Sequence, residues 1–246
     1  MKLSIITASY NSAATIRETL ESVSDQEYRN IEHIVVDGGS TDETIEIIQQ
    51  FSEKKVIVIS EPDNGIYDAF NKGIKMATGD IIGFVHSNDR LIDKNVITNV
   101  VNKFSSDAVE AVYGGLLYID VSKGRKVVRK WRPEAISKTG LFFGQRPPHP
   151  TLFFRSDVYA RLGFYDTNFK IASDYDFILR YFNNQTGKAV CLNQYLYEMK
   201  IGGISNAGIG NQLRKIYEEY LIIRSHKMNA LVTIVSKKLR KIKQLW

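Results

Sequence analysis

Over residues 1–104 the sequence alternates short apolar runs with stretches of helical periodicity, and this alternation constrains the fold most strongly. The apolar runs, which we expect to be strands, are Leu3–Ile6, Ile31–Val36, Val56–Ile59 and Ile81–Val85. The second run is almost continuously apolar, as in a strand covered on both faces of its sheet. Strands that alternate with helices predict an α/β fold whose mostly parallel, Rossmann-like sheet is flanked by helices.

The stretches between these runs carry apolar residues three and four positions apart, which is the periodicity of a helix. Thr15 and Glu18 have the spacing of a capping box at the start of the first helix. Thr41 is expected to cap the second helix, and two more are expected over Tyr67–Ala77 and Lys94–Phe104. Each predicted strand is therefore followed by a predicted helix.

The pattern is less regular in the second half of the chain. A strand over Ala111–Tyr118 is followed by a turn at Lys123-Gly124, which predicts a hairpin. Further on we expect, in order, a loop over Gly144–Pro150, helices over Ser156–Leu162 and Asp174–Phe182, a turn at Gly202-Gly203, and a helical stretch over 208–245. Because no repeat or linker interrupts this order, one domain with a helical tail is the simplest organisation.

The net charge of +6 is concentrated at one end of the chain. Residues 212–246 hold nine Lys and Arg residues against two Glu residues, so the rest of the chain is close to neutral. A protein that binds nucleic acid normally carries a basic face on its folded domain, so we expect no nucleic-acid partner.

The sequence also indicates a cellular location. The single cysteine, Cys191, excludes an intramolecular disulfide and a cysteine metal cluster. The apolar run at the start is too short for a secretory signal, and no run has the length of a membrane-spanning helix. We expect a cytoplasmic protein.

Acidic residues follow three of the predicted strands. Asp37 ends the second, Glu61 and Asp63 follow the third, and Asp89 follows the fourth. In open α/β sheets, ligands bind beyond the carboxyl ends of the strands, so these side chains are expected to meet at one edge. Carboxylate oxygens suit Mg²⁺ or Mn²⁺, and such a cation would neutralise the phosphates of a nucleotide. The sequence has neither a dinucleotide fingerprint nor a Walker loop, which argues against hydride transfer.

Four segments, in this order and spacing, make the chain resemble the family 2 glycosyltransferases, particularly bacterial members that assemble polysaccharide and lipopolysaccharide. They are Ser4–Asn11 (SIITASYN), Val36–Asp42 (VDGGSTD), Asp63–Gly73 (DNGIYDAFNKG) with Ala77–Asp80 (ATGD), and Ala172–Phe177 (ASDYDF). The resemblance implies a GT-A domain over residues 1–210, with a nucleotide-sugar half (1–110) and an acceptor half (111–210). Residues 211–246 would form a basic amphipathic helical tail.

The resemblance also implies a nucleotide site. Thr7 and Tyr10 would lie near the nucleobase, and Asp37 would accept a hydrogen bond from a pyrimidine N–H. Asp68 and Lys72 would lie near the nucleotide. The family often has Arg at the position of Phe70, so the contacts on this side differ from the family pattern.

The segment His86-Ser87-Asn88-Asp89 stands where the family has its Asp-x-Asp motif. Asn88 replaces one carboxylate there and is expected to contact the nucleotide. Asp89 then becomes the expected ligand of Mg²⁺ or Mn²⁺.

Asp174 matches the family's catalytic base, which removes the acceptor proton during attack on the sugar. Asp176 lies two residues further on, so it should point elsewhere on a helix. His149, in the proline-flanked loop, is a candidate for contact with the acceptor or the diphosphate.

In the tail, Leu231, Val235, Leu239, Ile242 and Trp246 fall on one helical face, with Lys and Arg residues beside them. This pattern is typical of a helix that lies in an anionic membrane interface, but a helix packed on the domain body gives it too. The tail therefore indicates a protein that is cytoplasmic, with peripheral attachment to the inner face of the membrane as one outcome.

Together these features predict an inverting glycosyltransferase. It would move a sugar, expected to be a hexose, from a UDP-sugar to a hydroxyl of a glycan or lipid-linked acceptor. Two other readings stay open at this point. One is another nucleotide-sugar enzyme, such as a nucleotidyltransferase, and the other is a binding protein that has lost catalysis.

Overall fold

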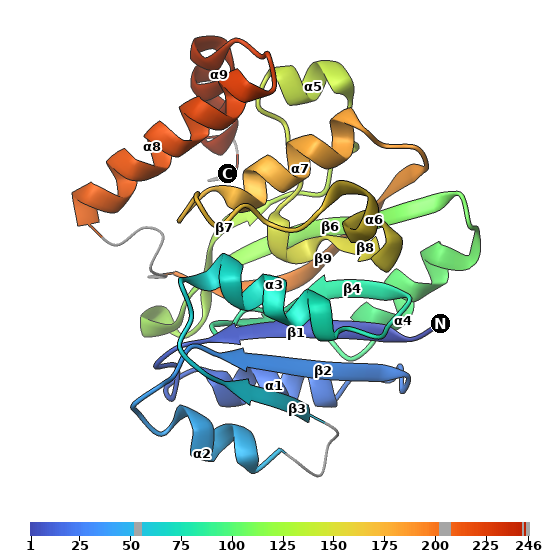
Figure 1. Ribbon diagram of the computed structural model, residues 1–246, viewed down its shortest axis with the longest axis vertical. Helices are drawn as coiled ribbons and strands as arrows, with labels where there is room; N and C mark the ends of the chain where they lie inside the picture. Colours follow the sequence, from blue (N-terminus) through green and yellow to red (C-terminus); the bar gives the residue numbers. More distant parts are fainter. Residues whose placement is uncertain (52–55, 202–207, 243, 245–246) are drawn as a thin grey trace.

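The computed structural model describes residues 1–51, 56–201, 208–242 and 244, and a single mixed sheet runs through it (Figure 1). The strands are β1 (Leu3–Ser9), β2 (Ile31–Asp37), β3 (Val56–Ser60), β4 (Ile81–Phe84), β5 (Asp89–Leu91), β6 (Val109–Asp120), β7 (Lys126–Trp131), β8 (Phe153–Arg155) and β9 (Lys188–Lys200). The α-helices are α1 (Ile16–Ser24), α2 (Thr44–Gln49), α3 (Ile66–Met76), α4 (Val96–Val101), α5 (Lys138–Phe142), α6 (Ser156–Leu162), α7 (Ser173–Asn183), α8 (Gly208–Ser225) and α9 (Ala230–Ile242).

The first four strands form the parallel part of the sheet in the order β3-β2-β1-β4. All seven residues of β1 are buried, although three of them, Ser4, Thr7 and Ser9, are polar. Strands β2 and β3 lie on one side of β1, whereas β4 lies on the other. The chain therefore reverses its direction of sheet growth between β3 and β4, which creates a crevice beyond the ends of β1 and β4.

The second half of the chain extends the same sheet beyond β4. Strand β8 pairs antiparallel with β4, β6 antiparallel with β8, and β9 parallel with β6. Short β5 pairs antiparallel with β9, and β7 with β6. The expected α/β fold is confirmed, with three parallel pairings among β1–β4 and a fourth between β6 and β9.

Helices cover both faces of the parallel strands, as expected from the alternating pattern. Ile6 of β1 and Ile34 of β2 pack with the apolar face of α3. Leu3 and Ile5 point to the other face, where they pack with Val23 of α1 and with α4. Figure 1 shows α3 in front of the sheet and α1 behind it.

Two glycines allow these layers to approach closely. A Cβ atom at Gly73 of α3 would lie 2.5 Å from Cγ2 of Ile6. A Cβ atom at Gly83 of β4 would lie 2.4 Å from Cδ1 of Phe153. Only glycine fits at either position without a shift of the neighbouring side chain.

The tail consists of two helices rather than one continuous helix. The chain turns between α8 and α9 at Lys227, whose φ is +58°. Helix α9 packs on the body through one face: the Thr233 hydroxyl donates to the carbonyl of Phe142, and the Arg240 guanidinium donates to the carbonyl of Phe143. In Figure 1 both helices lie at the top of the molecule, beside α5 and α7.

Some local expectations are wrong. The capping box at Thr15 and Glu18 does not form, because the Thr15 side chain makes no capping bond. The second helix begins at Thr44, and the carboxylate of Asp42, not Thr41, receives its first backbone N–H. Strands β5, β8 and β9 were not expected, whereas the hairpin at Lys123-Gly124 is confirmed as β6–β7.

Two features lie beyond what the structure describes. The turn predicted at Gly202-Gly203 and the end of the tail stripe, Trp246, fall outside the described residues. In the described part of the chain, no helix is both long and apolar enough to cross a membrane.

Candidate active site

The segments that follow β1 and β4 meet at the crevice in the sheet. The Ser12 hydroxyl lies 3.0 Å from the Ser87 hydroxyl, so the loop after β1 touches the loop after β4. Asn11 adopts a left-handed conformation (φ +45°), and its side-chain oxygen accepts a bond from the Thr41 N–H at 2.9 Å. The ends of β1, β2 and β4 are thus tied into one rim.

Asp37, at the end of β2, organises the loop that follows it. Its fully buried carboxylate accepts bonds from the N–H groups of Gly39 and Ser40, and from the hydroxyls of Ser40 and Ser60. Three of these four donors reach the same oxygen, Oδ2. The remaining oxygen, Oδ1, accepts only the Ser40 hydroxyl and keeps capacity for a further donor.

Two side chains expected near the nucleobase differ sharply in exposure. Tyr10 is 56% exposed, so its ring is available for a ligand. Thr7 is fully buried, and its hydroxyl donates to the Val85 carbonyl at 2.8 Å and lies 2.9 Å from Nε2 of His33. The Thr7 side chain therefore faces the core between the strands, not the rim.

Asp68 and Lys72 hold the loop between β3 and α3. Asp68 accepts a bond from the Asn64 N–H at 3.0 Å. Lys72 donates to the Pro62 carbonyl and forms an ion pair of 2.8 Å with Glu61. This ion pair raises the pKa of Lys72, so the side chain is a cation. Both residues lie at the expected edge of the sheet, but their polar atoms are occupied by this loop.

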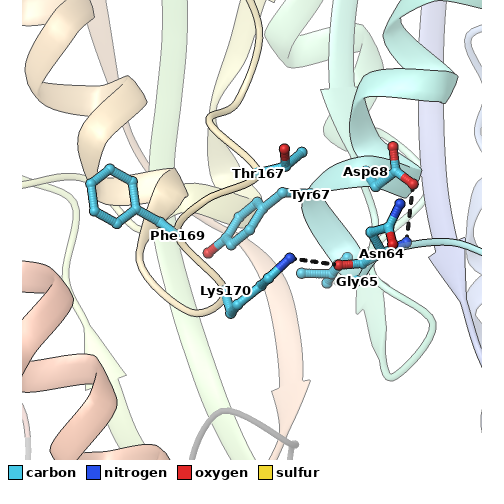
Figure 2. A pocket seen from close by; sticks show the side chains of 8 residues that line it. Asn64, Gly65, Tyr67, Asp68, Thr167, Phe169 and Lys170 are labelled. Atoms are coloured by element: carbon cyan, nitrogen blue, oxygen red, sulfur yellow. Dashed lines mark hydrogen bonds between the residues drawn. The ribbon is translucent and has the colours of Figure 1, made fainter.

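A small pocket lies at the start of α3, next to the segment that precedes α7 (Figure 2). Asn64, Gly65, Tyr67 and Asp68 line one side. Lys170 closes the other side by donating to the Asn64 carbonyl at 3.2 Å. The pocket therefore lies where the start of α3 meets the segment that precedes α7.

Asp89 begins β5 and is only 3% exposed. Its Oδ2 is buried without a hydrogen-bond partner, and burial raises the pKa of this carboxyl well above its ordinary value. The described residues contain no group of three His, Cys, Asp or Glu side chains that could hold a metal ion. A cation would satisfy the unpartnered oxygen, but a donor diphosphate and water would have to supply its other ligands, as Mg²⁺ usually requires.

Asn88, the neighbour of Asp89, faces β9. Its side-chain amide lies 3.4 Å from the Lys200 carbonyl, which leaves the amide oxygen without a protein partner among the described residues. Asn88 is half-buried, so this oxygen can meet a ligand at the rim.

Two imidazoles stack beside the end of β4. The rings of His86 and His149 lie 5.9 Å apart, and both stack on Phe70 of α3. Burial lowers the pKa of His86 to about 3 and also lowers that of His149, so both rings are neutral at pH 7. Nε2 of His149 lies 2.8 Å from the Tyr165 hydroxyl, which fixes the ring.

Asp174 lies in the first turn of α7, close to these imidazoles. Its Oδ1 is 3.1 Å from the hydroxyl of Tyr67, which also lies 2.8 Å from the Ile171 carbonyl. Burial raises the pKa of the Asp174 carboxyl, but its interactions with the His149 ring and with the Arg146 guanidinium outweigh this effect, and the pKa is lowered. Lys215 and Lys237 act in the same direction. Asp174 is therefore an ionised carboxylate at neutral pH.

Asp176 points away from Asp174, as the helical spacing predicts. Its carboxylate is 2.7 Å from Nε of Arg180 and 3.1 Å from Nε2 of His226. These contacts lower the pKa of Asp176 against the effect of burial. The residue joins α7 to the end of α8 and does not reach the cluster around Asp174.

The segment that carries Asp174 is held by the tail. The buried carboxylate of Glu218 on α8 accepts bonds from the N–H groups of Lys170, Ile171 and Ala172 at 2.8–3.0 Å. Because a charged acceptor makes stronger hydrogen bonds than a neutral one, this contact fixes the entry into α7. Helix α8 therefore positions the candidate base, although it comes 44 residues after it in the chain.

The sequence model of glycosyl transferase family 2 matches residues 4–163 of this chain, which is more than half of its length. An uncharacterized glycosyltransferase of Mycobacterium tuberculosis is 39% identical over 180 residues, covering 72% of this chain and 68% of that protein. The chain belongs to glycosyl transferase family 2. It is accordingly a glycosyltransferase.

Two solved glycosyltransferase structures share its fold. S. aureus TarS 1–349, in complex with UDP-GlcNAc, matches with a TM-score of 0.73 and 22% identity, covering 92% of this chain and 65% of that one. The mannosyltransferase PcManGT from Pyrobaculum calidifontis, in complex with GDP-Man and Mn²⁺, matches with a TM-score of 0.67 and 17% identity. The latter match covers 91% of this chain and 63% of that one, so this glycosyltransferase spans just under two thirds of either structure.

Several residues of the glycosyltransferase site had no assigned role in the sequence. Tyr67 lies inside a segment that carries the family resemblance, and His86 lies in the segment that stands at the Asp-x-Asp position. Neither the bond of Tyr67 to Asp174 nor the stacking of His86 on His149 could be seen in the sequence. Arg146 shares the loop of His149. Glu218 and Lys237 lie in the tail, where no local pattern connects them to a site in the body.

Substitution Glu218→Gln tests the hold of α8 on the glycosyltransferase's candidate base. An amide cannot accept at both former carboxylate oxygens, so we expect faster hydrogen exchange at residues 170–172 and a loss of at least about 2 kcal/mol in unfolding free energy. Glu134→Gln, which removes an exposed carboxylate that pairs with Arg240, is the control. Unchanged exchange at residues 170–172 would show that Glu218 does not fix this segment.

Proposed function

We propose that this glycosyltransferase moves a hexose from a UDP-sugar to a hydroxyl of a glycan or lipid-linked acceptor and inverts the anomeric centre. The observation that carries the proposal is the ionised carboxylate of Asp174, held at the start of α7 beside the crevice where ligands bind in α/β folds. A carboxylate at this place can take a proton from an acceptor on the side away from the nucleotide.

The donor's nucleobase would lie along the rim formed by the ends of β1 and β2. Tyr10 offers an exposed ring for stacking, and Oδ1 of Asp37 has capacity for a pyrimidine N–H. Asp68 and Lys72 would shape this side of the site by fixing the loop at 61–64. Direct contact between the Thr7 side chain and the base is not part of the proposal, because that hydroxyl is buried and paired.

Asp174 would act as the general base. Its Oδ1 lies beside the Tyr67 hydroxyl, which leaves Oδ2 for the acceptor hydroxyl. As Oδ2 takes the proton, the acceptor oxygen bonds to C1 of the sugar, and the bond from C1 to the diphosphate oxygen breaks. Its electron pair stays on the diphosphate. With attack opposite the leaving group and no enzyme nucleophile, the configuration at C1 inverts.

The departing diphosphate would lie near the end of β4. Asp89 would hold Mg²⁺ or Mn²⁺ through its unpartnered oxygen, with Asn88 beside it on the nucleotide. When bound, such a cation stabilises the negative charge that develops on the diphosphate. His149, neutral and adjacent to Asp174, is placed to contact the diphosphate or the acceptor through the edge of its ring that does not face Tyr165.

Substitution Asp174→Asn tests the base. We expect the release of UDP from UDP-hexoses to fall by about 10²–10⁴-fold, because the amide cannot accept the proton. The dissociation constant for UDP should change by less than about twofold, since Asp174 faces the acceptor. Asp157→Asn, which also removes an acid from the first turn of a helix but lies exposed on α6, is the matched control. Near-normal turnover in Asp174→Asn would refute the assignment.

The proposed metal ion is tested by the shift that UDP causes in the melting temperature of the protein. This shift is measured once with Mn²⁺ and once with EDTA. Ligand at a hundred times its dissociation constant stabilises the folded state by about 2.7 kcal/mol, which shifts the melting temperature by several degrees. We expect this shift only with Mn²⁺, and we expect Asp89→Asn to remove it. Asp93→Asn on the same segment should retain it. An equal shift in EDTA would exclude a metal-bridged donor.

The proposal includes binding of α9 to a membrane surface that carries the lipid-linked acceptor, because the apolar stripe predicted on this helix is exposed. Leu231 is 75% exposed, and Val235, Leu239 and Ile242 are each about half exposed. Since the opposite face of α9 packs on the body, the stripe and the neighbouring Lys238 and Lys241 remain at the surface. A basic helix with an apolar stripe fits an anionic bilayer interface, where each Lys or Arg contributes about 1 kcal/mol.

The double substitution of Leu231 and Leu239 by Gln tests this surface in the full chain. We expect binding to vesicles that contain phosphatidylglycerol to fall at least tenfold, while UDP affinity stays unchanged. The matched control is Val121→Gln with Val127→Gln, which removes two exposed apolar side chains in the hairpin before and within β7. Equal sedimentation of both double variants with the vesicles would contradict a membrane role for α9.

A further inference from the structure

A group of cations surrounds the start of α7 on the side turned toward the tail. We call Arg129, Arg146, Lys215, Lys237 and Lys241 the cationic cluster. Three of them alternate with aromatic rings. The guanidinium carbon of Arg129 lies 5.3 Å from the ring of Trp131, and that of Arg146 lies 5.7 Å from the same ring.

The ladder of cations and rings continues to the tail. Arg146 also lies 4.9 Å from the ring centre of Tyr175, and Nζ of Lys237 lies 4.5 Å from that ring. Tyr175 directly follows Asp174 in the chain, so the ladder passes one residue from the candidate base. The loop over Gly144–Pro150, strand β7 and helices α7 and α9 thus contribute to one surface.

The loop that carries Arg146 is rigid. Gly144 has a φ of +70°, and a Cβ atom there would lie 2.8 Å from Cβ of Lys237, so the loop and α9 are in close contact. The Gln145 side chain donates to the Ala135 carbonyl at 2.9 Å and accepts a bond from the Ser137 N–H at 3.3 Å. Arg146 is therefore presented from a fixed backbone.

The positive charge of the cationic cluster is poorly balanced. Lys237 forms an ion pair of 2.5 Å with Glu219, and Arg129 bonds to the neutral side chain of Gln244. Over the ranges that the structure describes, the other three cations have no ion pair. Burial and the charge of Arg146 lower the pKa of Lys237 to about 7, which reflects this repulsion.

Arg146 is the member of the cluster best placed for a ligand. Its guanidinium lies near the rings of Trp131 and Tyr175, while its five N–H donors have no hydrogen-bond or ion-pair partner in residues 1–51, 56–201, 208–242 and 244. The buried Tyr175 hydroxyl likewise lacks a partner there. The Arg146 nitrogens are not among the buried polar atoms without a partner, so they remain open to solvent and can meet a ligand.

We propose that Arg146, flanked by Lys215 and Lys241, binds a phosphate or diphosphate group of the acceptor and so brings the acceptor hydroxyl to Asp174. A guanidinium matches the oxygens of a phosphate bidentately. Three cations without ion pairs fit a ligand with more than one negative charge better than a single carboxylate. This inference rests on the proposed sugar transfer.

The position of Arg146 assigns the anion to the acceptor rather than the donor. The rim expected to hold the donor lies at the ends of β1, β2 and β4 and approaches Asp174 from the side of Tyr67. Among the described residues no hydrogen bond or ion pair joins Arg146 to this rim; its guanidinium lies against Tyr175, and the loop that carries it packs on α9. An acceptor anchored there would extend over Asp174 toward the donor sugar.

The test measures two ligands separately on the full chain. Inorganic pyrophosphate is titrated in EDTA by calorimetry and by tryptophan fluorescence in the Trp246→Phe background, where Trp131 beside Arg146 is the remaining tryptophan. UDP is titrated with Mn²⁺. We expect Arg146→Gln to weaken pyrophosphate binding at least tenfold and Lys215→Gln to weaken it several-fold, with UDP affinity within twofold of the unsubstituted chain. Arg29→Gln, an exposed cation that precedes β2, should leave both affinities unchanged.

Two results would overturn the proposal. One is that pyrophosphate does not bind the unsubstituted chain, or that it binds the unsubstituted chain, Arg146→Gln and Lys215→Gln with equal affinity. The other is an equal loss of UDP affinity in Arg146→Gln, which would place the cluster in the donor site. Failure of UDP to bind the unsubstituted chain would instead contradict the proposed donor, since the pyrophosphate titration needs no nucleotide. If Arg146→Gln does not fold, Lys215→Gln and Arg146→Lys carry the test.

A third ligand identifies the source of the phosphate. Geranyl diphosphate carries the same anion on a short apolar chain. Tighter binding of geranyl diphosphate than of pyrophosphate supports the diphosphate head of a lipid-linked acceptor. Equal binding supports a phosphate on a soluble glycan.

Discussion

The position of β1 between β2 and β4 is the constraint on which the site depends. Because β1 pairs in parallel with both strands, the loops that leave β1, β2 and β4 emerge at one edge of the sheet. The contact between the Ser12 and Ser87 hydroxyls joins two of these loops, and the bond from the Thr41 N–H to Asn11 joins the third. The rim proposed to hold the donor is a direct result of this strand order.

The proposed acceptor side of the molecule is built differently. Its candidate base, Asp174, lies on a helix, and the start of that helix is positioned by the tail rather than by the sheet. The carboxylate of Glu218 receives three backbone N–H groups ahead of α7, and Lys237 of α9 contacts the ring that follows Asp174. A surface that meets the membrane through α9 would thus be mechanically connected to the start of α7.

Electrostatics separates the roles of the carboxylates. Asp174 lies near several cations, which lower its pKa despite burial, so it is ionised and ready to accept a proton. Asp89 is buried with Lys200 as its only favourable charge, and its pKa is raised. Two aspartates that look equivalent in a motif search therefore differ because one is surrounded by cations and the other is not.

The sequence by itself determined the parallel strands of the first half and predicted which acids and amides lie at their ends. Apolar runs that alternate with helical periodicity are local patterns, so they were sufficient for this part of the fold. Tertiary structure alone decided that Thr7 points inward, that β9 joins β6, and that Arg146, Tyr175 and Lys237 form one surface. These contacts join residues 29 to 91 positions apart in the chain or depend on which face of a strand is covered, and no local periodicity encodes either property.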